Sequence, residues 1–106
     1  MSWLPVIEEV RDFAVFLKRA TLIQYPPRWR IVRDKDDHNT WWLVVESVRR
    51  NPDTRELWTV RYRSPRPILS TSYRYAHEQA RAELAKLAEH HGISLDKLAE
   101  GAWLPE

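Results

Sequence analysis

Apolar and polar residues alternate most regularly in the middle of the chain, over residues 40–63. Two runs of β-branched and aromatic residues flank a turn cluster at residues 51–54, in which Pro52 presets the backbone for a type I turn. Such runs are typical of strands whose side chains point alternately to two faces. The pattern therefore predicts a β-hairpin. The alternating run Arg28–Arg33 predicts a third strand, so we expect a three-stranded antiparallel meander with residues 40–50 in its centre.

The register of the hairpin decides which side chains are buried. A four-residue loop places Arg50 opposite Arg55 and Val45 opposite Val60, which gives one apolar face for the core. A slip by one residue would move Glu46 into that face, where an unpaired carboxylate costs several kcal/mol. The first register is therefore favoured. It leaves a second face that is both apolar and cationic, made of Trp42, Val44, Glu46, Val48, Leu57, Thr59, Arg61 and Arg63.

Two helices are expected around this sheet. Apolar residues recur at helical spacing near the N-terminus, and Pro26 stops any continuation, so we predict a helix from about residue 5 to residue 20. A long helix is predicted from Tyr73 to His91, capped by the serines before it and ended by Gly92.

The segments outside these helices complete the predicted fold. Residues 64–67 are proline-rich, and we expect them to carry the chain away from the sheet. Ser94 is expected to cap a short helix that ends at Gly101. The predicted fold is an α+β single domain, 1–106: an N-terminal helix, the meander, a long C-terminal helix and a short terminal helix.

Composition and charge narrow the functional classes. The formal net charge is only +2, but residues 28–66 hold ten basic and six acidic side chains, and thirteen of the seventeen cations are arginine. Two explanations of the high arginine content are equally good. One is a GC-rich genome, and the other is recognition of phosphate or carboxylate groups. The chain has no cysteine, and no basic leader or long apolar run opens it. We therefore expect a cytoplasmic protein without a membrane segment.

Candidate catalytic and metal-binding residues do not form a recognisable pattern. His77 and His91 lie about 21 Å apart along the predicted helix, which is too far for one ion. Glu46 is the one carboxylate within a predicted strand, and its simplest interpretation is an ion pair with Arg61 across the sheet. Residues 87–98 resemble the turn of a helix-turn-helix, although the second helix would be short and acidic. We expect no enzyme activity, no metal site and no cofactor.

Two binding hypotheses remain. The first is a nucleic-acid-binding module, for DNA or RNA, that uses the basic aromatic sheet face. Its candidate residues are Arg28, Arg30, Trp42, Arg49, Arg50, Arg55, Arg61 and Arg63.

The alternative is a protein–protein interaction module, either a homodimer or a small adaptor or inhibitor. It would dock through Trp42, Val44, Val48 and Leu57. If helices cover both faces of the sheet, neither hypothesis gains support.

Overall fold

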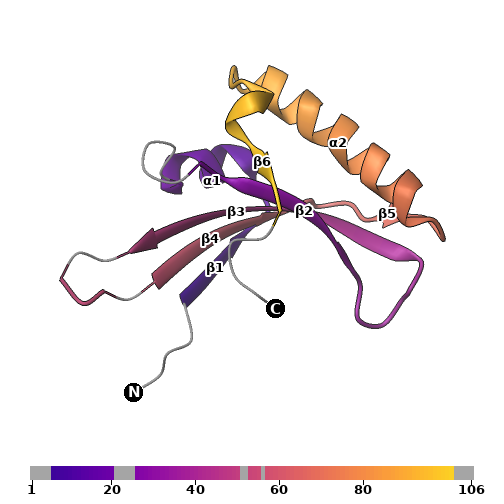
Figure 1. The fold of residues 1–106 in the computed structure, drawn as a ribbon, viewed down its shortest axis with the longest axis horizontal. Helices are drawn as coiled ribbons and strands as arrows, with labels where there is room; N and C mark the ends of the chain where they lie inside the picture. The colour runs from indigo at the N-terminus through magenta and orange to yellow at the C-terminus, as the bar shows by residue number, and fades with distance from the viewer. Residues whose placement is uncertain (1–5, 21–25, 51–52, 56, 102–106) are drawn as a thin grey trace.

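The computed structural model describes residues 6–20, 26–50, 53–55 and 57–101, whose fold is α+β with a six-stranded mixed sheet (Figure 1). The elements, in chain order, are β1 (Val6–Val10), α1 (Phe13–Arg19), β2 (Arg28–Arg33), β3 (Thr40–Arg50), β4 (Leu57–Arg63), β5 (Ile68–Leu69), α2 (Tyr73–His90), the 3₁₀ turn η1 (Leu95–Lys97) and β6 (Ala99–Glu100).

The sheet is larger than the predicted three-stranded meander and is not purely antiparallel. Its strand order is β1-β4-β3-β2-β6, and β5 pairs with β3 beside the end of β4. The meander β2–β3–β4 is present with β3 in its centre. However, β1 joins β4 in parallel and β6 joins β2 in parallel. The predicted architecture is therefore wrong in its extent, because both ends of the described chain return to the edges of the sheet.

The predicted helix from residue 5 to residue 20 is wrong in its first half. Residues Val6–Val10 form β1, and the helix begins only after Asp12, whose side chain accepts hydrogen bonds from the backbone N–H groups of Ala14 and Val15. Asp12 is thus a helix N-cap placed in the middle of the predicted helix. β-branched residues favour a strand here. Val10 is partly buried against the core, whereas Ile7 on the opposite face is 46% exposed.

The hairpin register differs from the prediction by two residues. Arg50 lies opposite Leu57 rather than Arg55, and Val45 lies opposite Tyr62 rather than Val60. Arg55 adopts a left-handed backbone conformation with φ of 62°, so it belongs to a longer connection and not to the strand. A shift of two residues preserves the alternation of side chains, so every residue keeps its predicted face.

Two predicted connections are also corrected. The proline-rich segment after β4 does not leave the sheet, because Ser64 donates its backbone N–H to the Leu43 carbonyl and β5 then pairs with Thr40 and Trp41. The short terminal helix predicted from Ser94 to Gly101 is the single turn η1 followed by β6. The described residues therefore contain no second helix of a helix-turn-helix.

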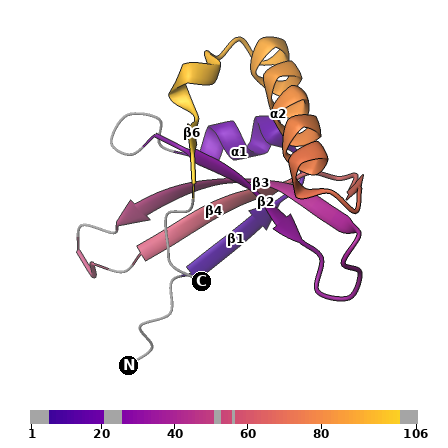
Figure 2. The same cartoon turned by 45° about the vertical axis from the view of Figure 1, so that its right-hand side comes forward.

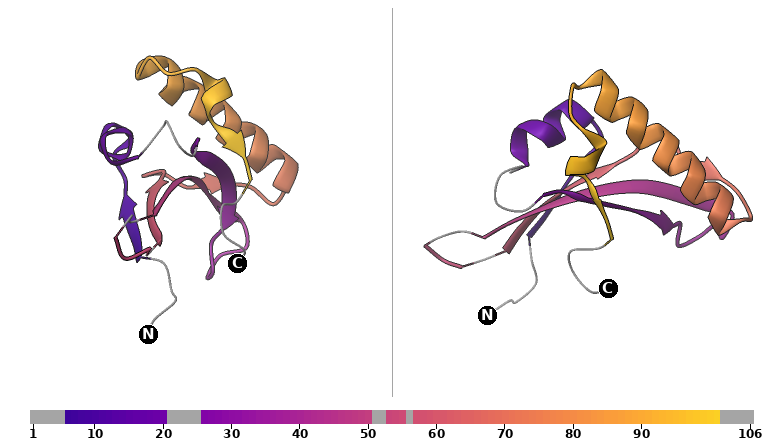
Figure 3. Two further views of the ribbon diagram at one scale, coloured as in Figure 1. Left: turned by 60° about the vertical axis from the view of Figure 1, so that its left-hand side comes forward. Right: turned by 45° about the horizontal axis from the view of Figure 1, so that its top comes forward.

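The long helix α2 is where the sequence places it. Ser72 caps its N-terminus by accepting the backbone N–H of Tyr75, and Gly92, with φ of 69°, ends it. α2 packs on β2, β3 and β5, whereas α1 packs on β1 and β4. Figures 1, 2 and 3 show both helices on the same side of the sheet.

Most buried apolar residues form one cluster between the helices and this side of the sheet. Aromatic rings fill its centre, with Phe13 packed edge-to-face on Tyr62 at 5.1 Å between ring centroids. Fully or nearly fully buried members of the cluster are Phe13, Phe16, Trp29, Leu43, Val45, Val60, Tyr62, Ala80 and Leu84. The hydrophobic core thus lies on one side of the sheet, and the functional question concerns the other side.

Candidate functional site

The side of the sheet opposite both helices carries a different set of side chains, which we call the helix-free face. Strand alternation and the observed registers assign residues to it, and among the described residues no helix packs there. Its described members are Ile7, Glu9, Arg28, Arg30, Val32, Trp42, Val44, Glu46, Val48, Thr59, Arg61 and Arg63.

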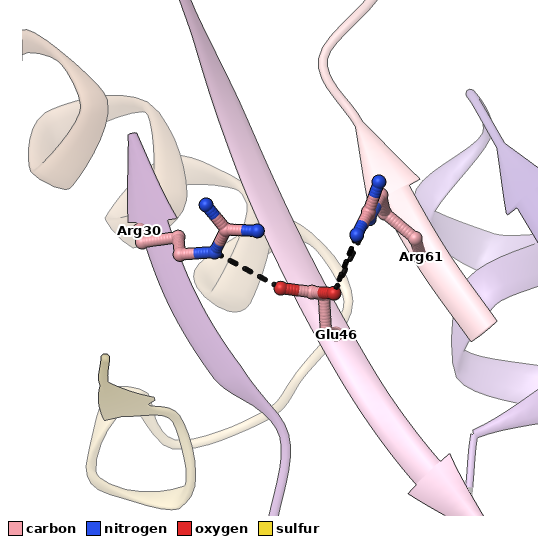
Figure 4. A network of polar contacts seen from close by, with 3 residues as sticks. All are labelled: Arg30, Glu46 and Arg61. Atoms are coloured by element: carbon pink, nitrogen blue, oxygen red, sulfur yellow. Dashed lines mark hydrogen bonds and ion pairs between the residues drawn. The ribbon is translucent and has the colours of Figure 1, made fainter. Parts of the chain in front are cut away.

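Glu46 is the centre of a polar network on this face. Its Oε1 accepts a hydrogen bond from Arg30 Nε on β2 at 3.1 Å, and its Oε2 accepts from Nε and Nη2 of Arg61 on β4 at 3.2 and 3.0 Å. The Glu46 side chain is only 4% exposed. A buried carboxylate is costly without partners, and here two guanidinium groups balance its charge. Figure 4 shows Arg30 and Arg61 approaching the Glu46 carboxylate from the two neighbouring strands. The predicted ion pair between Glu46 and Arg61 is confirmed.

Trp42 lies two alternation steps from Glu46 along β3, with Val44 between them on the same face, and is fixed by a different set of contacts. Its indole N–H donates to Asp34 Oδ2 at 3.0 Å, and the guanidinium carbon of Arg63 lies 4.8 Å from its ring centroid. The backbone N–H of Asp36, and then the Trp42 indole, hold the pKa of Asp34 below its ordinary value. Asp34 therefore carries a full negative charge at neutral pH.

A second carboxylate from an unpredicted strand completes the charge pattern. Glu9 Oε1 on β1 lies 2.6 Å from Arg63 Nε, in an ion pair without the alignment of a hydrogen bond. Arg63 thus contacts both the Glu9 carboxylate and the Trp42 ring, whose indole N–H is bonded to Asp34. A cleft of about 400 Å³ opens over these groups. Five cationic and three acidic side chains line it, together with Val32, Trp42 and Val44: Arg30, Arg33, Lys35, Arg61, Arg63, Glu9, Asp34 and Asp36.

The structure brings most of the predicted site residues together. Arg28 and Arg30 on β2 lie opposite Glu46 and Val44 on β3, and Arg61 and Arg63 on β4 lie opposite the same two residues. Two columns of arginine therefore flank β3, as the alternation predicts. Val44 and Val48 are buried on this face and Trp42 is partly buried.

The arginines predicted at the turn are placed differently. Arg55 is exposed in the turn and does not line the cleft. Arg49, Arg50 and Leu57 belong to β3 and β4 by their backbones, but their side chains lie outside the described part of the structure.

Sequence reasoning missed the acidic members of the cleft. Asp34 and Asp36 directly follow the predicted strand Arg28–Arg33, and this position could have indicated that they lie near Trp42. Glu9 was assigned to a helix, so its place beside Arg63 depended on recognising β1 as a strand. The β-branched residues of β1 and the capping potential of Asp12 were the signals that could have found it.

The chemistry available on this face is the binding of charged and aromatic groups. Guanidinium groups donate hydrogen bonds to phosphate or carboxylate, and the indole offers an aromatic surface. Among the described residues, no group of three or more potential metal ligands is close enough to hold an ion. In the same part of the chain, neither helix combines the length and apolarity that crossing a membrane requires.

Comparison of this chain with protein-family models, with curated proteins and with solved structures found no match.

Proposed function

We propose that this protein is a small, non-enzymatic nucleic-acid-binding module that acts through the helix-free face. The observation that carries the proposal is the pair of arginine columns on that face, with Arg30 and Arg61 held by the two oxygens of one buried carboxylate. The two arginine columns hold four arginines, and the acidic residues paired with them are Glu46 and Glu9, so this group of side chains has a formal excess of positive charge. Phosphate groups are the natural counter-ions for such fixed guanidinium groups.

Glu46 supports this function rather than competing with it. A guanidinium held by a carboxylate loses less conformational freedom when it binds an anion than a freely rotating side chain does. Arg63, stacked on Trp42, is restrained in the same way. The absence of cysteine and the small net charge fit a cytoplasmic module of modest affinity.

Fluorescence anisotropy with labelled DNA and RNA oligonucleotides tests this proposal. With three phosphate contacts, the logarithm of the affinity should fall with the logarithm of salt concentration with a slope of about −2 on single strands. Arg63→Gln should weaken binding by roughly 3- to 10-fold, because one phosphate contact is lost.

Arg74→Gln is the matched control, since it removes the same charge from α2, where the Arg74 side chain is 89% exposed. Equal effects of Arg63→Gln and Arg74→Gln would contradict the proposed face. No binding of any oligonucleotide at high micromolar protein and low salt would contradict the function itself.

A second candidate function is protein interaction, as a homodimer or as an adaptor or inhibitor. The specific observation in its favour is the mixture of charges in the cleft, where Glu9, Asp34 and Asp36 stand among the cations. Protein interfaces combine such charge pairs with aromatic and arginine anchors. Sedimentation equilibrium tests the homodimer version: a monomer at all concentrations excludes it, and a dimer that Trp42→Arg dissociates supports it.

A further inference from the structure

We propose that the helix-free face takes single-stranded rather than double-stranded nucleic acid, with the sugar–phosphate backbone in the cleft beside Trp42. This inference rests on the proposed function and defines its substrate class. Three observations favour a single strand: the guanidinium groups are recessed, the cleft is bordered by carboxylates, and an arginine–tryptophan stack lies beside the phosphate-binding groups.

The guanidinium groups of the cleft are recessed and do not protrude. The side chains of Arg30, Arg61 and Arg63 are 18%, 29% and 30% exposed, and the space in front of them measures about 400 Å³. That volume is at the lower end of the range for small-molecule pockets. A flexible single strand can lower one backbone segment into such a space. The stiff duplex presents its phosphates on a broad cylinder and is best contacted by elements that project into a groove.

The acidic groups around the cleft also favour a single strand over a duplex. Asp34 and Asp36 lie in the β2–β3 connection and Glu9 lies across the cleft on β1. A duplex laid across this face carries two rows of phosphates, and one row would approach these carboxylates. Like charges at short distance weaken binding. A single strand that follows Arg30 and Arg61 carries only one row of phosphates, so fewer of its charges approach the carboxylates.

The contact between Arg63 and Trp42 supplies the part of the site that a base would use. The Arg63 guanidinium carbon lies 4.8 Å from the Trp42 ring centroid, and that of Arg11 lies 6.0 Å from it. Unpaired bases stack on aromatic side chains and on guanidinium planes, whereas paired bases inside a duplex do not expose their faces. Phosphate-binding groups and a stacking column therefore lie within one cleft, as a single strand requires.

The test compares one labelled oligonucleotide of about 12 nucleotides as single-stranded DNA, as single-stranded RNA and as the annealed duplex, under identical low-salt conditions. We expect single strands to bind at least about tenfold more tightly than the duplex, and the two single-stranded ligands separate DNA from RNA. Equal or tighter duplex binding would overturn this inference and leave the proposed function intact. Binding of neither form would overturn both.

Two variants locate the preference in the cleft. Trp42→Leu should weaken single-strand binding roughly 5- to 100-fold, the range that loss of one stacking platform gives, and should change duplex binding less. Trp58→Leu is the control. Trp58 is exposed on the other side of the sheet, so this substitution should alter binding less than about twofold.

Asp36→Asn removes one of the carboxylates that border the cleft, and it should improve duplex binding more than single-strand binding. A ratio of affinities unchanged in both Trp42→Leu and Asp36→Asn would contradict the assignment.

Discussion

The two faces of the sheet are built from the same strands and differ in the contacts that their side chains make. The covered face buries Leu43, Val45 and Tyr62 beneath two helices, and its contacts are apolar and aromatic. The helix-free face buries Glu46, whose charge is matched by arginines on both neighbouring strands. Side chains on one face are therefore committed to stability, whereas those on the other retain charged groups that a ligand can contact.

The largest expected effect comes from removing a large ring on the covered face. Phe16 is fully buried and packs beside Phe13 and Tyr62. Phe16→Ala should lower the free energy of unfolding by about 3 to 5 kcal/mol, because apolar burial is lost and a cavity remains. Urea denaturation followed by circular dichroism measures this. A loss below about 1 kcal/mol would show that the covered face is not the main source of stability.

An intermediate effect is expected at high pH, and it also belongs to the covered face. Burial, and then the nearby charges of Glu83 and Asp12, raise the pKa of Tyr62 to about 12 from 10.0. The pKa of Tyr62 is higher in the folded than in the unfolded protein. The stability that protonated Tyr62 contributes is therefore fully present below pH 10 and is lost as pH rises towards 12. The shift corresponds to about 2 to 3 kcal/mol.

Denaturation of the protein and of Tyr62→Phe at pH 9 and pH 11.5 isolates this contribution. The protein should lose more stability than Tyr62→Phe over that interval, since the variant cannot ionise at this position. Parallel losses in both proteins would contradict the assignment to Tyr62.

The smallest of these effects is expected at the centre of the helix-free face. Glu46→Gln removes the charge that holds Arg30 and Arg61, and it should cost about 1 to 2 kcal/mol of stability. This is less than for a fully buried pair, because both guanidinium groups are partly exposed. Glu78→Gln, in the exposed pair with Arg74, is the control and should cost less than about 0.5 kcal/mol. Equal losses in the two variants would remove the distinction between an organised network and ordinary surface pairs.

The sequence predicts the two faces well because alternation is a local property. The strand Arg28–Arg33, the two hairpin strands and the long helix that begins at Tyr73 are correctly placed, and Glu46 is correctly kept out of the aromatic core. The predicted register is wrong by two residues, since Arg55 extends the turn, but an even shift leaves both faces unchanged. The arginine columns and their relation to Trp42 could therefore be predicted without knowledge of the exact pairs.

The parts that could not be predicted depend on contacts between distant segments. β1 pairs with β4, about fifty residues later, and β6 pairs with β2 across most of the chain. The apolar residues of Val6–Val10 fit helical spacing and strand alternation alike, so periodicity alone does not separate the two. Glu9 reaches Arg63 only because β1 is a strand. The acidic residue on the β1 side of the cleft was missed for this reason.

Glu46 joins the side chains of three adjacent strands through a single carboxylate. In the proposed function, this carboxylate would orient a phosphate-binding group on each side of the central strand. Loss of the carboxylate would release both guanidinium groups together. Arg30 and Arg61 therefore form one pair, and a change at the central strand would affect the contacts of both neighbouring strands.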